Sequence, residues 1–247
     1  MDESNLYYKT VTKELKSWEK QMMKRPRLAN RASKAVQVRL QKLIPQKAQD
    51  IITASVKTMI KTMMTGSGVL TTTEAASNPT LAESDYLVEQ KYAAYHKAAV
   101  AQGIGFGFGG ILINLADLPA LMTIKVKFLF DCAKLYGYDV NKESERLFML
   151  HVFQLAFCCD RRRSEIFPII KNWDKQSEDV AVDWESLQTE YRDYMDIAKL
   201  LQLLPIVGAA AGGAANHSLM KKLKTTAVNC YRLRIIDKEA VVLSNFD

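Results

Sequence analysis

Apolar side chains recur at three- and four-residue steps along almost the whole chain, a period that places them on one face of a helix. Strand-like alternation is nearly absent, and Ala240-Val241-Val242-Leu243 is the only strand candidate. The pattern therefore predicts an all-α fold, a single multi-helix bundle. The expected helices cover residues 4–23, 27–43, 45–66, 82–102, 118–136, 141–159, 183–204 and 205–235.

Glycine and capping residues mark the ends of several of these helices. Gly66-Ser67-Gly68 and Gly137 are typical of helix C-termini, because glycine readily adopts the left-handed conformation found there. Asn141 is a candidate N-cap for the helix that follows it. The threonine-rich residues 69–82 and the basic residues 161–163 are expected to form a loop and a turn.

The length and composition fit one globular domain. With 247 residues, 48% hydrophobic and 25% charged, the chain can bury a core, which excludes a disordered or collagen-like protein. We expect basic amphipathic helices in residues 1–68 and core helices in residues 82–247. Four scattered cysteines are too few for a disulfide scaffold, and Met1-Asp2-Glu3-Ser4 does not resemble a secretory signal. These features favour a cytoplasmic protein.

The positive charge is concentrated in one quarter of the chain. Residues 20–73 contain eleven basic residues and a single acid, Asp50, whereas the remainder carries a net charge of −3. Such a block usually contacts an anionic surface, either phospholipid headgroups or nucleic acid, although a solvated helix face is the plainer alternative. Nucleic acid is the weaker reading, because no aromatic residue lies between Trp18 and Tyr86 to stack on bases.

Within this block, residues 27–43 form a basic amphipathic helix with an alanine-rich apolar arc. A helix of this kind can lie in a membrane interface, or its apolar arc can pack on the protein and leave the charges to contact lipid. The candidate membrane- or partner-binding residues are Lys24, Arg25, Arg27, Arg31, Lys34, Arg39 and Lys42.

Two apolar stretches, residues 98–124 and 200–220, contain most of the glycines. Small residues four positions apart let two helix backbones approach closely, in a soluble core as well as in lipid. We expect the two stretches to pack together in the core. A membrane-inserted hairpin is the alternative, since each is long enough to span a bilayer, which needs ~20 residues. The helix-packing candidates are Gly103, Gly105, Gly107, Gly109, Gly110, Gly208, Gly212 and Gly213.

No motif in the sequence specifies a reaction. The run from Gly105 to Gly110 matches a dinucleotide-binding pattern but follows an expected helix instead of the strand that this motif needs. Asp117 is expected to cap the next helix, with a polar site as the alternative. His96, His151 and His217 lie on three expected helices, and their spacing does not require a metal. We therefore expect no catalytic residue, no cofactor and no metal.

Several segments follow one another in an order that resembles a known family. They are Ile44-Pro45-Gln46-Lys47 with Gly66-Ser67-Gly68, residues 103–119, Tyr136-Gly137-Tyr138-Asp139, residues 204–216 and Arg232-Leu233-Arg234. Together they resemble the EcsC family, small proteins encoded beside the ATPase and membrane subunits of a bacterial ABC transporter. The resemblance implies a cytoplasmic accessory protein linked to an exporter at the inner face of the membrane.

The leading hypothesis is a non-enzymatic accessory protein that docks on the anionic membrane surface or on ABC transporter subunits, without binding nucleic acid. One alternative is a helical hydrolase that uses Asp117 and a histidine. Another is an integral membrane protein inserted through residues 98–124 and 200–220. The sequence does not specify an oligomeric state.

Overall fold

The computed structural model describes residues 3–24, 46–66, 69, 71, 73–105, 118–158, 160–175 and 208–244. Within these residues the fold is all-α, as predicted, and no strand occurs. The helices are α1 (Glu3–Met22), α3 (Gln46–Thr65), α4 (Leu81–Gly105), α6 (Leu118–Leu135), α7 (Glu143–Phe157), α8 (Asp160–Lys171) and α11 (Gly208–Ser244), with a 3-10 turn at Trp173–Lys175.

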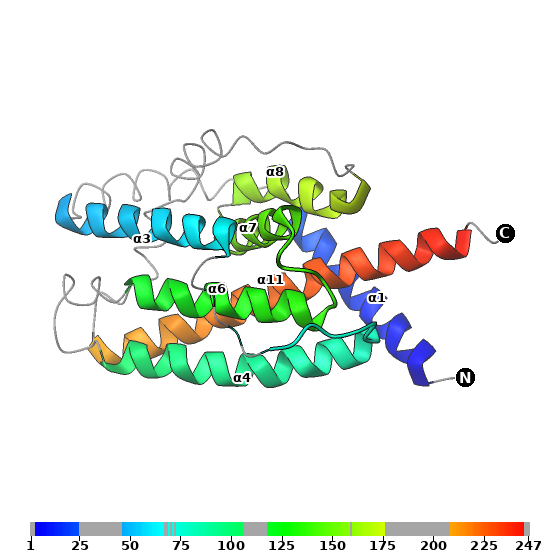
Figure 1. The fold of residues 1–247 in the computed structure, drawn as a ribbon, viewed down its shortest axis with the longest axis horizontal. Coiled ribbons are helices and arrows are strands. Elements are labelled where there is room, and N and C mark those ends of the chain that lie inside the picture. The colour runs from blue at the N-terminus through cyan, green and yellow to red at the C-terminus, as the bar shows by residue number, and fades with distance from the viewer. Residues whose placement is uncertain are drawn as a thin grey trace.

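The longest helix, α11, runs the length of the bundle (Figure 1). It lies antiparallel to α4, since Glu89 and His96 of α4 contact Lys224 and His217 of α11 respectively. Helices α1, α6, α7 and α8 also pack against α11. Within the described residues, α11 therefore packs against five other helices.

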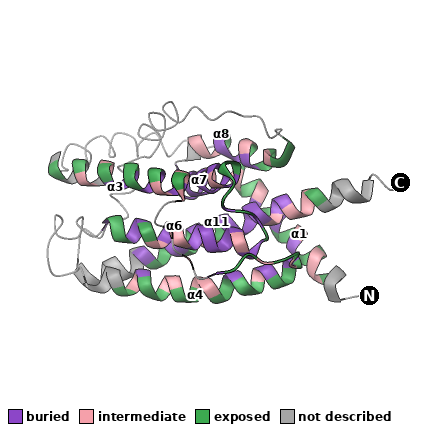
Figure 2. Ribbon diagram, in the orientation of Figure 1, coloured by how far each residue is buried: buried purple, intermediate pink, exposed green. Residues whose placement is uncertain are grey.

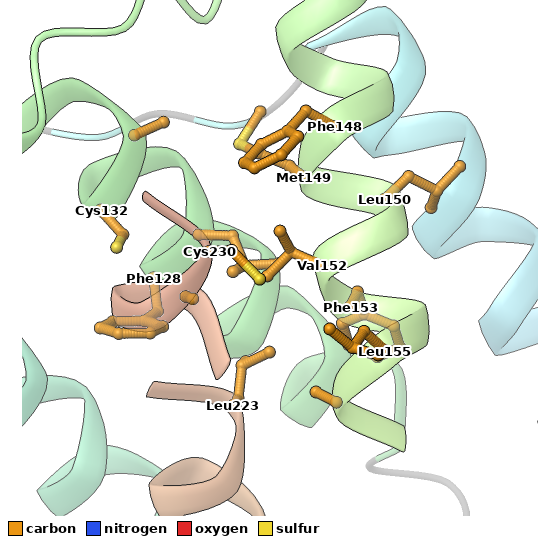
Figure 3. Close-up of a cluster of buried hydrophobic side chains, with 14 of the residues drawn as sticks. Phe128, Cys132, Phe148, Met149, Leu150, Val152, Phe153, Leu155, Leu223 and Cys230 are labelled. Atoms are coloured by element: carbon orange, nitrogen blue, oxygen red, sulfur yellow. The ribbon is translucent and has the colours of Figure 1, made fainter. Parts of the chain in front are cut away.

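The core is built around α7, α6 and the middle of α11. Eleven of the fifteen residues of α7 are buried, because α3, α8 and α11 pack around it. Figure 3 shows Val152 of α7 close to Cys230 of α11, while Figure 2 shows more exposed residues along α3 and α4. Aromatic rings contribute much of this interior; the rings of Phe153 and Phe157, for example, lie 4.7 Å apart.

Several predicted helix ends are confirmed. Gly66 and Gly137 follow α3 and α6 with φ angles of 64° and 79°, a conformation that strains any residue with a Cβ atom. Helix α4 begins with a capping box that the sequence analysis missed, although its Thr-x-x-Glu spacing is recognisable. Thr80 Oγ1 donates to Glu83 Oε2 over 2.8 Å, and the Glu83 N–H donates to Thr80 Oγ1 over 3.3 Å.

Three local predictions are wrong. Residues 240–243 are helical, because neither glycine nor proline occurs after Gly213 to stop α11, and an existing helix extends easily through valines. Residues 161–163 lie within α8 instead of a turn. The N-cap of α7 is Lys142, and the Asn141 N–H donates to Asp139 Oδ1 over 2.9 Å, so Asn141 belongs to a turn.

The expected helices at residues 27–43 and 183–204 lie outside the described residues.

Candidate functional site

Helix α1 presents apolar and basic residues on opposite sides. Val11, Leu15 and Trp18 are buried against the bundle. Four lysines spaced four, three and four residues apart lie within an arc of about 60° on the far side, at 100° per residue. All four are exposed. This lysine stripe consists of Lys9, Lys13, Lys16 and Lys20.

Two acids of α1, Glu14 and Glu19, lie beside the stripe but do not pair with it. Glu14 lies on one flank and pairs with Arg232 at 3.2 Å, and Glu19 lies on the other flank and pairs with Lys171 at 2.6 Å. Both carboxylates are thus directed to cations of α11 and α8. Among the described residues, none of the four stripe lysines forms an ion pair with a carboxylate.

A surface hollow of about 620 Å³ lies along the stripe. The described residues that line it provide four ammonium groups, which can donate hydrogen bonds to an anion, and three hydroxyl groups, of which that of Thr12 already donates to the Tyr8 carbonyl over 2.7 Å. They are Tyr8, Lys9, Thr12, Lys13, Lys16, Ser17 and Lys20.

Only part of the predicted basic block can be placed. Lys24 is exposed two residues after the end of α1. Lys57 and Lys61 are exposed on α3. The other six candidates lie outside the described residues, namely Arg25, Arg27, Arg31, Lys34, Arg39 and Lys42.

The predicted glycine contact stays a prediction. Gly103 and Gly105 lie in the last turn of α4, and Gly208, Gly212 and Gly213 lie in the first turns of α11. These helices are antiparallel neighbours, but the described side chains do not test whether the glycines meet. Gly107, Gly109 and Gly110 lie outside the described residues.

Asp117 also lies outside the described residues, so the hydrolase hypothesis is not tested. The helix that it was expected to cap does begin at the next residue, Leu118, with Pro119 in the first turn. As for insertion, no helix within the described ranges has a stretch long and apolar enough to cross a bilayer.

The Arg232-Leu233-Arg234 segment is at the centre of two buried polar networks. Arg232 Nε and Nη2 each lie 3.0 Å from Asp85 Oδ2. The hydroxyl of Tyr7 donates to the same carboxylate over 2.6 Å, and that of Tyr136 donates to Asp85 Oδ1. Burial and the Asp85 carboxylate raise the pKa of Tyr7 to about 12, so its hydroxyl stays a donor. This network joins α1, α4, α11 and the end of α6.

Arg234 forms the second network. Its guanidinium makes a bidentate contact with Glu145 of α7, with N–O distances of 2.6 and 2.7 Å, and a further contact with Asp174 at 2.6 Å. The group also lies 4.0 Å from the ring centroid of Tyr138 and 4.4 Å from that of Phe148. The Arg234 guanidinium is therefore surrounded by two aromatic rings and two carboxylates of the protein. It holds helices together and is not free to bind a substrate.

Two of the three histidines come together. His96 Nε2 of α4 lies 2.6 Å from His217 Nδ1 of α11, and burial together with the neighbouring His217 lowers the pKa of His96. His151 of α7 instead lies against the ring of Trp173, and burial lowers its pKa. Within the described ranges, no group of three or more histidine, cysteine, aspartate or glutamate side chains could hold a metal ion.

The core contains a buried lysine that the sequence pattern does not predict, because lysine is usually exposed. Lys125 of α6 is 2% exposed, and its Nζ atom has only the Leu121 carbonyl as a partner among the described residues, at 3.4 Å. Burial lowers the pKa of Lys125 to about 8. Asp131, on the same helix, is directed elsewhere: its Oδ2 accepts a hydrogen bond from Tyr95 over 2.7 Å and lies 3.8 Å from Lys91.

Comparison with known proteins agrees with the resemblance seen in the sequence. The pattern of the EcsC protein family matches residues 9–236. The chain is 41% identical to Protein EcsC of Bacillus subtilis (strain 168) over 230 residues, which cover 93% of this chain and 97% of that protein. It is 33% identical to the uncharacterised protein YdbA of the same bacterium over 144 residues, or 56% of this chain and 53% of YdbA. No solved structure matches. The chain belongs to the EcsC protein family.

Proposed function

We propose that the protein is a non-enzymatic accessory protein of a bacterial ABC transporter system and that it docks electrostatically on the anionic inner surface of the membrane. The observation that supports docking is the lysine stripe of α1, which has four exposed ammonium groups and no carboxylate partner among the described residues. The link to a transporter rests on the family resemblance, and membership of the EcsC family supports it.

The stripe is large enough to give measurable binding. From Lys9 to Lys20 the stripe extends over eleven helical steps, a length of about 16 Å at 1.5 Å per residue. A lysine near an anionic leaflet contributes about 1 kcal/mol, so the stripe contributes up to about 4 kcal/mol. That free energy corresponds to about a thousandfold in partitioning at low salt.

The mode of contact follows from the burial of α1. Because Val11, Leu15 and Trp18 pack against the protein, they are not available to enter the hydrocarbon. The stripe therefore contacts phosphate groups at headgroup level, and lysine hydrogen-bond donors in the hollow add to the Coulombic attraction.

The test is flotation of the protein with vesicles of phosphatidylcholine, with and without phosphatidylglycerol. We expect binding only when phosphatidylglycerol is present, and release as salt rises, because the screening length falls to about 10 Å at 0.1 M. Equal binding to neutral vesicles, or binding that salt does not weaken, would contradict the proposal.

Variants locate the contact on α1. Replacing the four stripe lysines by glutamine should abolish most of the binding, and a control variant with the same net charge should bind like the wild type. The stripe variant is K9Q/K13Q/K16Q/K20Q, and the control changes exposed lysines elsewhere, K97Q/K142Q/K175Q/K221Q. If both variants lose binding equally, overall charge and not the stripe is responsible.

A further inference from the structure

Two imidazole rings that are 121 residues apart in the sequence meet across the contact between α4 and α11. His96 Nε2 and His217 Nδ1 lie 2.6 Å apart, and the ring centroids are separated by 4.7 Å with the planes at 78°. His217 is exposed and His96 is half-buried, so the facing nitrogens lie at the surface of the bundle. The antiparallel packing of the two long helices brings them together.

The two nitrogens converge on a single point. At this distance one ring must donate an N–H while the other accepts it, because two unprotonated nitrogens would repel each other. A neutral imidazole has one unprotonated ring nitrogen, and that nitrogen can bind a metal. When the shared proton is absent, both lone pairs are directed at the space between the rings.

A metal ion fits this space after a small adjustment. Zinc–nitrogen bonds are about 2.0–2.1 Å long, so two nitrogens on a tetrahedral ion lie about 3.3 Å apart. The rings would have to separate by less than 1 Å, which partly exposed side chains can do by rotation about χ1 and χ2. The metals that prefer imidazole are zinc, copper and nickel, and two histidines leave open positions for water.

The charged groups around the pair leave the site accessible. Glu89 and Lys224 pair with each other further along the same contact, and Lys224 lies over the ring of Tyr92 at 5.2 Å. The Tyr92 ring centroid lies 5.3 Å from that of His96 and forms one wall of the site. Glu89 is therefore already engaged, which leaves the two imidazoles as the protein ligands among the described residues.

We propose that His96 and His217 form a two-histidine site for a divalent transition-metal ion such as Zn²⁺, and that the bound ion joins α4 to α11. An ion that binds the folded protein stabilises it in proportion to the logarithm of its concentration above the dissociation constant. The site is independent of the lysine stripe, which lies on α1.

The first experiment measures the melting temperature of the full-length, tag-free protein with ZnCl₂, NiCl₂ or MgCl₂. We expect zinc and nickel to raise the melting temperature reversibly, with reversal by EDTA, and magnesium to have no effect, because it prefers oxygen ligands. Isothermal titration with ZnCl₂ should give one site per chain. If neither zinc nor nickel changes the melting temperature, the proposal is wrong.

The second experiment assigns the ligands. H96Q and H217Q should each weaken zinc binding at least tenfold, because a single imidazole is a weak ligand, and the double variant should show no zinc binding. H151Q is the matched control and should keep the wild-type affinity, since His151 lies on α7 against Trp173. Zinc binding that survives in the double variant would overturn the assignment, whatever the outcome of the vesicle experiments.

Discussion

Replacement of Lys125 by methionine tests whether a charged group is held in the core of this protein. Lys125 is 2% exposed on α6, and among the described residues no carboxylate lies near enough to pair with it. Methionine has a similar length and no charge, so it can occupy the same space without the ammonium group. We expect K125M to be more stable than the wild type at neutral pH.

The size of the effect follows from the pKa. Burial lowers the pKa of Lys125 from its ordinary value of 10.5 to about 8. Because one pH unit corresponds to about 1.4 kcal/mol, keeping the charged amine in the folded protein costs about 3 kcal/mol. K125M should therefore raise the free energy of unfolding by about 3 kcal/mol at pH 7.

The dependence on pH gives the sharper test. Below pH 8 the amine is charged in both states and the full cost is present. Between pH 8 and 10.5 the folded protein has lost this proton while the unfolded chain keeps it, so the Lys125 contribution to stability rises with pH. The advantage of K125M should decline by about 3 kcal/mol over this interval.

Urea unfolding of both proteins at several pH values from 7 to 10.5 measures this difference. Burial raises the pKa of groups such as Cys132 and Tyr136 well above its usual range, so they lose their protons more readily when the protein unfolds, but they are present in both proteins and cancel in the comparison. K127M, two residues along the same helix at a half-buried position, is the control and should show no such pH dependence. An advantage of K125M that is constant with pH, or a loss of stability at pH 7, would refute the reasoning.

Two further changes test the contacts that join the helices. E145Q leaves the buried guanidinium of Arg234 without its bidentate partner, so it should lower the free energy of unfolding, measured with urea, by about 3–5 kcal/mol. The double variant E145Q/R234M should recover part of that loss. If the losses of the two single variants simply add in the double variant, the two residues do not pair directly. T80A removes the capping box of α4 and should lower the free energy of unfolding by about 1 kcal/mol, measured in the same way. If T80A is as stable as the wild type, the capping box does not stabilise the protein.

The helices were predictable because their signals are local. Apolar residues at three- and four-residue steps placed α4 within three residues of its observed ends. Gly66 and Gly137 were predictable as helix ends, since a positive φ angle belongs to a single residue. The errors at residues 240–243 and at Asn141 are local too, and they arose where a continuing helix or an adjacent turn overrode a weak residue preference.

The polar contacts were not predictable because they depend on how helices align. Asp85 and Arg232 are separated by 147 residues, and His96 and His217 by 121. Which side chains face each other depends on the register of α4 against α11, and core packing fixes that register. In the sequence, Arg232 is notable only as part of the family resemblance, which implies no role for it.

The docking surface proposed on α1 has a different physical basis from the basic helix expected at residues 27–43, which lies outside the described residues. An amphipathic helix that lies in a bilayer inserts its apolar face, but the apolar face of α1 is buried in the protein and Glu14 is tied to Arg232. The stripe is therefore held rigidly, and binding does not have to order four lysines on a flexible segment, a loss of entropy that would weaken the contact. Because the four lysines lie along one side of a helix, they can all contact the membrane surface only if the axis of α1 is parallel to it. The contact proposed here is therefore expected to be strong at low salt, shallow, and reversible when salt screens it.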